Sequence, residues 1–192
     1  DRMYLFFDTE TTGIPKNYKA PASDSRNWPR LVQLAWLLVD KDGNEQKSVE
    51  HIIKPNGFSI PADAARIHGI TNEVAAQKGV ELKLALEQIT ADFAGAKILI
   101  AHNMSFDEKI LGAELLRTGF ANQVESMKRK CTMLASVDLC AIPGNYGNKW
   151  PKLQELYKKL FQQEFADAHN ALADVRACAK CYFELKRLGV MK

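Results

Sequence analysis

The sequence predicts an α/β protein whose centre is one mixed sheet flanked by helices. Three segments with strand character come first, and a hairpin signal lies between the second and the third. The later strand segments alternate with helical ones, as expected when helices cover a sheet. The chain has 192 residues, enough for one domain with a full hydrophobic core. We therefore expect a single domain over residues 1–192.

Five short segments have the apolar character and the flanking turn residues of strands in a sheet. The first contains the run from Tyr4 to Phe7, and the second is the strongly apolar segment that ends at Val39. Asp40 to Gly43 then form a hairpin signal. The five expected strands cover residues 2–8, 30–39, 46–54, 97–101 and a short part of 128–133.

Apolar residues recur at helical spacing in much of the remaining chain. Thr71 is expected to cap a short helix that Gly79 ends. In the helix that follows the fourth strand, we expect Leu116 to face inward. The expected helices cover residues 61–65, 71–79, 81–93, 105–117, 153–161 and 168–188, with a helical turn that ends near 139 and a loop over 143–147.

Composition narrows the classes of protein to consider. The net charge of +3 permits a nucleic-acid partner without arguing for one. Apolar runs such as Leu34–Val39 are too short to cross a membrane, and the chain leads directly into its first strand without a signal peptide. Cys178 and Cys181 form a C-x-x-C within a helical pattern, where we expect reduced core thiols. A cytoplasmic setting is the expectation.

Two carboxylates stand at the end of the first strand, in the stretch from Tyr4 to Gly13. Asp8 and Glu10 are separated by one residue, so on a strand they point to the same face. Two ionised carboxylates this close repel each other and lose hydration when they are partly buried, so a shared proton or a cation must offset the cost. Oxygen ligands of this kind suit Mg²⁺ or Mn²⁺. The alternative is two solvated acids at a strand end.

Polar residues also occur at two later places where the local pattern favours apolar ones. Asp107 follows the fourth strand and falls in the first turn of the next helix, where an acid is also favoured by the helix dipole. Asp174 lies near the buried side of the last helix, where an unpaired carboxylate is costly. His169 precedes it by five residues and alone could be a capping or surface histidine. Together the acids and the histidine suit two-metal phosphoryl chemistry.

Three segments carry a resemblance to a known family. Phe7-Asp8-Thr9-Glu10-Thr11-Thr12-Gly13, His102-Asn103-x-x-Phe106-Asp107 and His169-x-Ala171-x-x-Asp174 resemble the three motifs of the DEDDh 3′–5′ exonucleases, also called DnaQ-like. Their order and separations fit, and the segment from Arg66 to Thr71 resembles a fourth one. The position of His169 indicates the histidine branch of the family.

The resemblance implies an RNase H-like fold with a five-stranded mixed sheet, and a site that holds two divalent ions, Mg²⁺ or Mn²⁺. Asp8 would bridge both ions, Glu10 and Asp174 would complete the first, and Asp107 would hold the second. His169 would be the general base, a task suited to imidazole. The residues implied for binding the terminal nucleotide are Thr9, Thr11, Ile67, His68, Asn103 and Phe106, of which His68 and Phe106 could equally be core residues.

The activity implied is metal-dependent 3′–5′ hydrolysis that releases nucleoside 5′-monophosphates from single-stranded or mispaired DNA. An exoribonuclease or oligonucleotide-degrading enzyme of the same family is the close alternative. A catalytically silent nucleic-acid-binding module is a third possibility, and a mutase or phosphatase a weaker one. The chain stops at Lys192 without the tail by which the epsilon subunit of DNA polymerase III grips its polymerase, which puts a polymerase partner in doubt.

The segment Ile14–Pro29 is longer than in compact family members and long for a loop in a compact domain. It contains two aromatic residues, Tyr18 and Trp28, that could stack on bases. It also contains or adjoins the basic residues Lys16, Lys19, Arg26 and Arg30, which could contact phosphates. The expectation is a solvated surface insertion with Trp28 packed against the sheet. The alternative is a lid over the 3′ end that favours frayed or single-stranded substrates.

Overall fold

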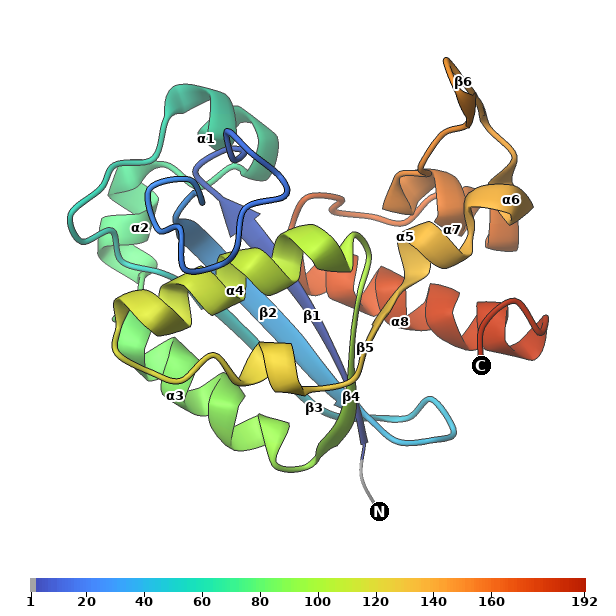
Figure 1. Ribbon diagram of the computed structural model, residues 1–192, viewed down its shortest axis with the longest axis horizontal. Coiled ribbons are helices and arrows are strands. Elements are labelled where there is room, and N and C mark those ends of the chain that lie inside the picture. The colour runs from blue at the N-terminus through green and yellow to red at the C-terminus, as the bar shows by residue number, and fades with distance from the viewer. Residues whose placement is uncertain (1–2) are drawn as a thin grey trace.

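The computed structural model describes residues 3–192, and its centre is a mixed sheet with the strand order β3-β2-β1-β4-β5 (Figure 1). β1 pairs antiparallel with β2 and parallel with β4. β2 pairs antiparallel with β3, and β4 parallel with β5. The strands are β1 Met3–Thr11, β2 Leu31–Val39, β3 Glu45–Ile52, β4 Ala96–Ala101 and β5 Arg129–Cys131. The predicted five-stranded mixed sheet is confirmed, whereas Arg2 lies outside the described residues.

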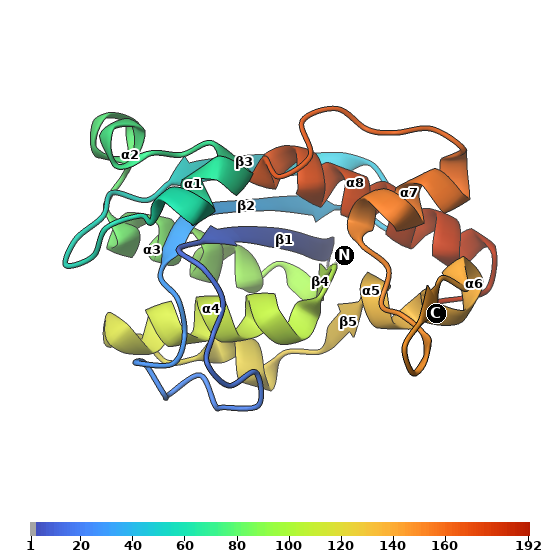
Figure 2. The ribbon, with the colours of Figure 1, turned by 90° about the horizontal axis from the view of Figure 1, so that it is seen from above.

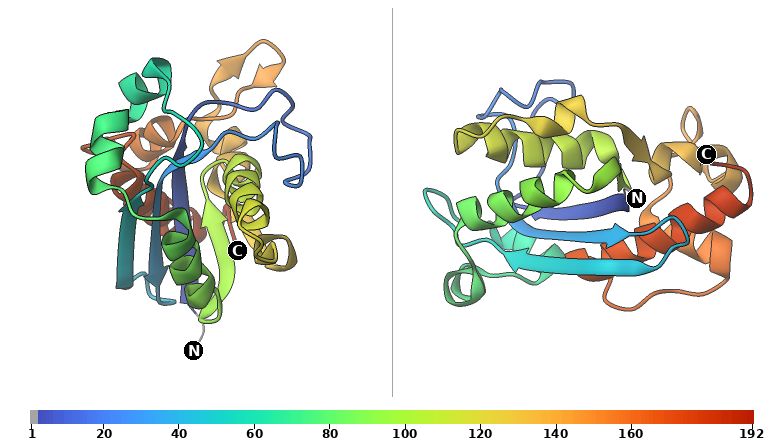
Figure 3. Two further views of the ribbon diagram at one scale, coloured as in Figure 1. Left: turned by 90° about the vertical axis from the view of Figure 1, so that its left-hand side faces the viewer. Right: turned by 90° about the horizontal axis from the view of Figure 1, so that it is seen from below.

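Helices cover both faces of this sheet (Figure 2). α3 and α4 lie on one face and α8 on the other, and the two views of Figure 3 show the same layers from the side and from below. The helices are α1 Ala62–His68, α2 Asn72–Lys78, α3 Leu82–Phe93, α4 Met104–Arg117, α5 Thr132–Ala135, α6 Val137–Cys140, α7 Leu153–Phe161 and α8 Ala171–Arg187, with a 3₁₀ turn η1 at Gln123–Ser126.

The two-residue repeat of β1 decides which face each of its side chains meets. Leu5 and Phe7 are buried in the core under α3 and α4. Tyr4 and Phe6 are buried on the opposite face, in the core beneath α8. Because Asp8 continues the parity of Phe6, the acids at the end of the strand are directed to the α8 face.

Local cap residues set the helix boundaries. The Thr71 side chain accepts a hydrogen bond from the Val74 N–H, which confirms the expected cap of α2. α8 begins at Ala171 rather than at 168, because the Asn170 side chain accepts from the Ala173 N–H and so caps the helix. His169 therefore lies in the turn before α8, with a backbone φ of 71°.

Two details of the expected helices and loops are different in the structure. Leu116 is exposed, and the buried face of α4 instead includes Leu111 and Leu115. The segment expected to be a loop over 143–147 contains a small hairpin, formed by β6 Pro143–Gly144 and β7 Gly147–Asn148. These differences do not alter the sheet.

The segment Ile14–Pro29 has no helix or strand, but it is packed against the protein. Trp28 is only 3% exposed, and its Nε1–H donates to the Pro21 carbonyl at 2.9 Å. The Arg117 guanidinium donates to the Trp28 carbonyl at 2.8 Å, which attaches the segment to the end of α4. The expected packing of Trp28 is therefore confirmed: its ring is part of the core and is not offered to bases, as the alternative would require. Tyr18 is exposed.

Cys178 and Cys181 lie in the buried face of α8 as free thiols. Burial raises the pKa of the Cys181 thiol to about 12, so it stays protonated and unreactive at neutral pH. Among residues 3–192, no helix combines the length and the apolar character needed to cross a bilayer.

Candidate active site

The carboxyl end of β1 presents Asp8 and Glu10. The strand runs three residues beyond its expected end, to Thr11, so both acids lie within regular β structure and share a face. Asp8 Oδ2 is buried and has no hydrogen-bond partner among the described residues. A buried carboxylate oxygen without a partner is costly. The position therefore requires a proton or a positive charge close by.

The start of α8 brings a third acid and the histidine to the same place. Asp174 lies in the first turn of α8, and its Oδ1 accepts the His169 backbone N–H at 3.1 Å. One ligand atom from each of Glu10, His169 and Asp174 can be chosen so that all three lie within 4.8 Å of one another. The positive φ of His169 turns the chain so that its ring and Asp174 face Glu10 together.

The fourth acid approaches from α4. Asp107 lies in the first turn of this helix, is almost fully buried, and accepts a hydrogen bond from Thr9 Oγ1–H at 2.6 Å. Thr9 points to the α4 face of β1, whereas its neighbours Asp8 and Glu10 point to the α8 face. Asn103 begins the helix in a left-handed conformation, with φ 78°. Such a turn is tolerated by Asn better than by most residues.

Burial raises the pKa of all four carboxylates, and repulsion between the acids adds to the shift at Asp8, Glu10 and Asp107. Burial, reinforced by repulsion from the three other acids, raises the pKa of Asp8 well above its ordinary value. Burial likewise raises the pKa of Glu10 to about 8, with Asp174 and Asp107 contributing repulsion. Burial raises the pKa of Asp107 to about 8 and that of Asp174 to about 6. Without a cation, the site must hold protons at neutral pH.

The same residues fit a divalent cation. The four acids offer carboxylate oxygens, which suit Mg²⁺ or Mn²⁺, and the imidazole of His169 lies beside them. Asp8 Oδ2 is the oxygen that most needs a positive partner. A cation would replace the protons that burial and repulsion otherwise hold on the site. The structure brings Glu10, His169 and Asp174 together and places Asp8 near the other acids, whereas a catalytic role for these residues stays a prediction.

The residues expected to bind a terminal nucleotide are only partly assembled. Thr9 and Thr11 are buried, and Ile67 is exposed. His68 Nδ1 accepts the Ile70 N–H at 3.1 Å, so its Nε2 carries the proton and donates to the Thr11 carbonyl at 3.2 Å. Burial lowers the pKa of His68, which keeps the ring neutral.

Asn103 and Phe106 are both half-buried. Phe106 packs against the core under α3 and α4, so it has a packing role as well as its place beside Asp107. The structure brings Asn103 close to the site as the residue that begins α4.

Two glutamines near the site have no counterpart in the sequence predictions. Gln33 Oε1 accepts the Ala171 N–H at 3.0 Å and so fixes the start of α8 against β2. Gln33 could have been found from sequence, since it is a polar residue within an otherwise apolar strand. Gln154 Nε2 lies 3.4 Å from His169 Nε2. Nothing in the local sequence marks this second contact.

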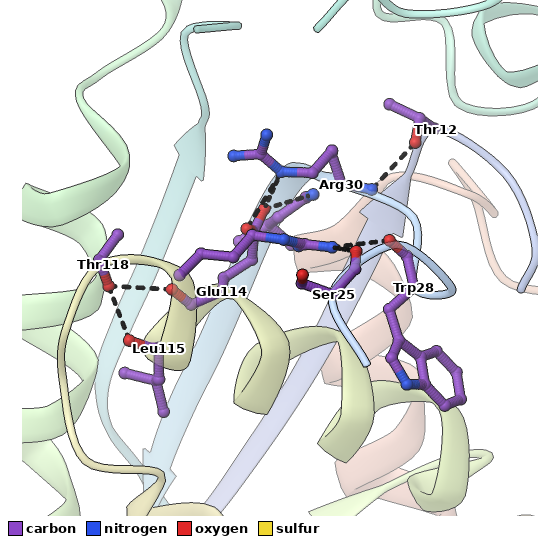
Figure 4. Close-up of polar contacts among 9 residues, drawn as sticks. Thr12, Ser25, Trp28, Arg30, Glu114, Leu115 and Thr118 are labelled. Carbon is purple, nitrogen blue, oxygen red and sulfur yellow. Dashed lines mark hydrogen bonds and ion pairs between the residues drawn. The ribbon is translucent and has the colours of Figure 1, made fainter. Parts of the chain in front are cut away.

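A buried ionic cluster supports the turn that follows β1 (Figure 4). Glu114 in α4 accepts from Arg30 Nε at 3.1 and 3.2 Å, from the Leu31 N–H at 2.9 Å and from Arg117 Nη1 at 2.8 Å. The Arg30 N–H in turn donates to Thr12 Oγ1 at 3.0 Å. The cluster therefore joins α4, the start of β2 and Thr12, which lies two positions after Glu10.

This fold and this arrangement of acids define a nuclease of the RNase H-like class. The family model RNase_T, described as exonuclease, matches residues 5–182. The chain belongs to this exonuclease family, whose DnaQ-like members include relatives named as epsilon subunits of DNA polymerase III.

Three similar proteins illustrate the relationship. The epsilon subunit of DNA polymerase III from Rickettsia felis is 28% identical over 94% of this chain and 72% of its own length. An uncharacterized exonuclease of Escherichia phage 186 is 25% identical over 90% of this chain and 82% of its own. The zinc-bound E. coli exonuclease I–single-stranded DNA complex is 23% identical, with a TM-score of 0.77, and shows the likeness in fold. The match covers 98% of this chain but 41% of that one.

Proposed function

We propose that this chain is one exonuclease domain over residues 1–192 that removes nucleoside 5′-monophosphates from the 3′ end of DNA with the help of divalent metal ions. The observation that carries this proposal is the meeting of four mutually repelling carboxylates with His169, around a buried oxygen of Asp8 that has no partner among the described residues. Without cations, such a site must hold protons to avoid repulsion between its carboxylates. Divalent cations bound there would stabilise the attacking and leaving oxygens during phosphodiester hydrolysis.

Asp8, Glu10, Asp107 and Asp174 would hold two ions, Mg²⁺ or Mn²⁺. When bound, the ions supply the positive charge that stabilises the attacking and leaving oxygens of the phosphodiester. Asp8 is central to this set because its pKa responds to all three of the other acids. The Thr9 hydroxyl would hold the Asp107 carboxylate in place by its hydrogen bond.

His169 would take the proton from the attacking water on a ring nitrogen. Its ring lies beside Glu10 and Asp174, is exposed to solvent, and can therefore pass the proton on. Two contacts would orient it: its backbone N–H donates to Asp174, and its Nε2 lies beside the Gln154 amide.

The 3′-terminal nucleotide would lie against the turn after β1 and the start of α4. The exposed Ile67 would contact the base, and Asn103 and Phe106 would border the sugar. Thr9 and Thr11 would contribute backbone groups, because their side chains are buried. His68 would act by holding the Thr11 carbonyl rather than by touching substrate.

DNA is the substrate we favour because of the relatives. The names of the polymerase III epsilon subunits and the single-stranded DNA complex of E. coli exonuclease I support it. A DNA polymerase is a partner suggested by the epsilon relatives alone. The free cysteines support a cytoplasmic setting.

The test is to incubate the protein with 5′-labelled single-stranded DNA, mispaired duplex and RNA, each with and without Mg²⁺. The proposal predicts a metal-dependent ladder that shortens from the 3′ end, faster on single-stranded and mispaired DNA than on RNA. Glu87→Gln, an exposed change on α3, should leave the ladder unchanged. A ladder only on RNA would reassign the substrate, and no ladder on any of them would overturn the activity.

A further inference from the structure

The hairpin β6–β7 and the residues after it carry two aromatic side chains that the fold leaves uncovered. Tyr146, between the two strands, is 103% exposed, and Trp150, two residues after β7, is 62% exposed. Burial of an aromatic ring stabilises a fold, so two rings left in water contribute nothing to folding. Trp28 and Trp36, by comparison, are both buried in the core.

This exposed segment is held in a defined shape. Pro143 pairs with Asn148 and Gly144 with Gly147, and the Lys149 N–H donates to the Ile142 carbonyl at 2.8 Å. The positive φ of Gly147, 106°, allows the tight turn. A rigid backbone lowers the entropy cost when its side chains bind a partner.

Two contacts connect the same segment to the candidate active site. His102 Nε2 lies 2.8 Å from the Pro151 carbonyl, and His102 directly precedes Asn103 at the start of α4. Gln154 Nε2 lies 3.4 Å from His169 Nε2. Residues 150–154 therefore extend from His102, at the start of α4, to His169, before α8. The hairpin projects from the edge of the molecule toward which β1 runs (Figure 1).

The charge of this segment suits a polyanion. Between residues 142 and 152 the only charged side chains are Lys149 and Lys152. Lys149 is paired with Glu155 at 2.7 Å, whereas Lys152 has no salt bridge within the described part of the chain. Exposed aromatic rings with lysines beside them are the usual surface for single-stranded nucleic acid, since every base has a face on which to stack.

We propose that Trp150 and Tyr146 form a stacking surface for single-stranded DNA upstream of the 3′-terminal nucleotide. Trp150 would take a base close to the site, because the neighbouring Pro151 is attached to His102. Tyr146, at the hairpin tip, would take a base further along the strand. This inference rests on the proposed exonuclease function, and it assigns the longer-range binding to this hairpin rather than to Trp28.

The test compares a long and a minimal substrate. Specificity constants, kcat/KM, are measured with Mn²⁺ for the single-stranded oligonucleotide dT12 and for the 4-nitrophenyl ester of thymidine 5′-monophosphate. Trp150→Ala and Tyr146→Ala should each lower kcat/KM for dT12 by about 5- to 150-fold, the effect of losing one stacked base. The ester, which cannot reach the hairpin, should change by less than about two-fold. Leu188→Ala, at an exposed position after α8, is the matched control.

A second measurement does not depend on hydrolysis. Trp150 is the one exposed tryptophan among Trp28, Trp36 and Trp150, so quenching of tryptophan emission by dT12 in EDTA at low salt reports contact with its ring. Trp150→Phe should lose the quench yet keep most of kcat/KM for dT12, because phenylalanine still stacks.

The outcomes separate the two proposals. If the wild type hydrolyses neither substrate but is quenched by dT12, the exonuclease proposal fails and the binding surface stands. If it hydrolyses dT12 and both alanine variants remain within about two-fold of it, the stacking surface is refuted. Absence of any quench in the wild type refutes it as well.

Discussion

Replacing Glu10 by glutamine should make the metal-free protein more stable, although it removes a residue of the candidate metal site. Carboxylate oxygens of Glu10 and Asp174 lie within 4.8 Å of each other. At that separation, and with an effective dielectric constant of about 20, two unit charges repel by about 3.5 kcal/mol. The Glu10 side chain has no hydrogen bond to any described residue that the amide would lose. We expect Glu10→Gln to gain up to about 3 kcal/mol at pH 8 in EDTA.

The expected gain corresponds to a rise in Tm of about 6–12 °C, since about 2–4 °C accompanies each kcal/mol in a domain of this size. Thermal unfolding is followed by circular dichroism in EDTA and again with excess Mn²⁺. With Mn²⁺ at one thousand times the dissociation constant the order should reverse, because only the wild type gains the full binding energy of about 4.1 kcal/mol, which exceeds the advantage of the variant. Glu87→Gln, on the exposed face of α3, should follow the wild type in both conditions.

One outcome would refute this reasoning directly. If Glu10→Gln is less stable than the wild type in EDTA and shows the same shift with Mn²⁺, then Glu10 neither repels its neighbours nor holds a metal ion. The carboxylates would then be solvated acids at a strand end, and the candidate site would lose its electrostatic basis.

Three further predictions concern pH, catalysis and support of the site. In EDTA the Tm should fall as pH rises from about 4 to about 8. The raised pKa values of Glu10 and Asp107, both about 8, let the folded protein keep protons that the unfolded chain releases near pH 4. Mn²⁺ should flatten this decline in Tm. A Tm that climbs throughout this pH range contradicts the prediction. His169→Ala should lower kcat about 10²- to 10⁴-fold while keeping the Mn²⁺-induced rise in Tm; an unchanged kcat at neutral pH would make the histidine structural. Glu114→Ala should lower the free energy of unfolding by about 3–5 kcal/mol in guanidinium titrations, because it leaves two arginines without their buried partner; the exposed change Glu73→Ala should cost far less, and equal losses would remove the role of the buried cluster.

Much of the fold could be predicted from sequence because its elements follow local patterns. The expected helix over 153–161 is α7, and the cap at Thr71 is present as predicted. The start of α8 was missed because it depends on Asn170, whose side chain competes for the first free N–H groups. The extent of β1 was missed as well, since its last residues, Thr9 to Thr11, are held in the strand by pairing with β2, which no local pattern reveals.

The acids of the site could be predicted because each interrupts an apolar pattern. Asp8 and Glu10 also share a strand face by simple alternation, which needs no tertiary information. The supporting contacts were invisible for the opposite reason. The contact from His102 to the Pro151 carbonyl spans 49 residues, so no local period reveals it. For Trp28 the sequence offered two interpretations, and only its burial in the folded chain decides between them.

The central claim is that the four carboxylates hold divalent ions for hydrolysis from the 3′ end. It is tested most directly by the release of mononucleotide from 3′-labelled single-stranded DNA, followed over time for the wild type and Asp8→Asn. In Mn²⁺ the wild type should release labelled nucleoside 5′-monophosphate from the first time point, and excess EDTA should abolish the release. Asp8→Asn should be inactive in both conditions while remaining folded. Release that continues in excess EDTA, or at the wild-type rate in Asp8→Asn, would contradict the account.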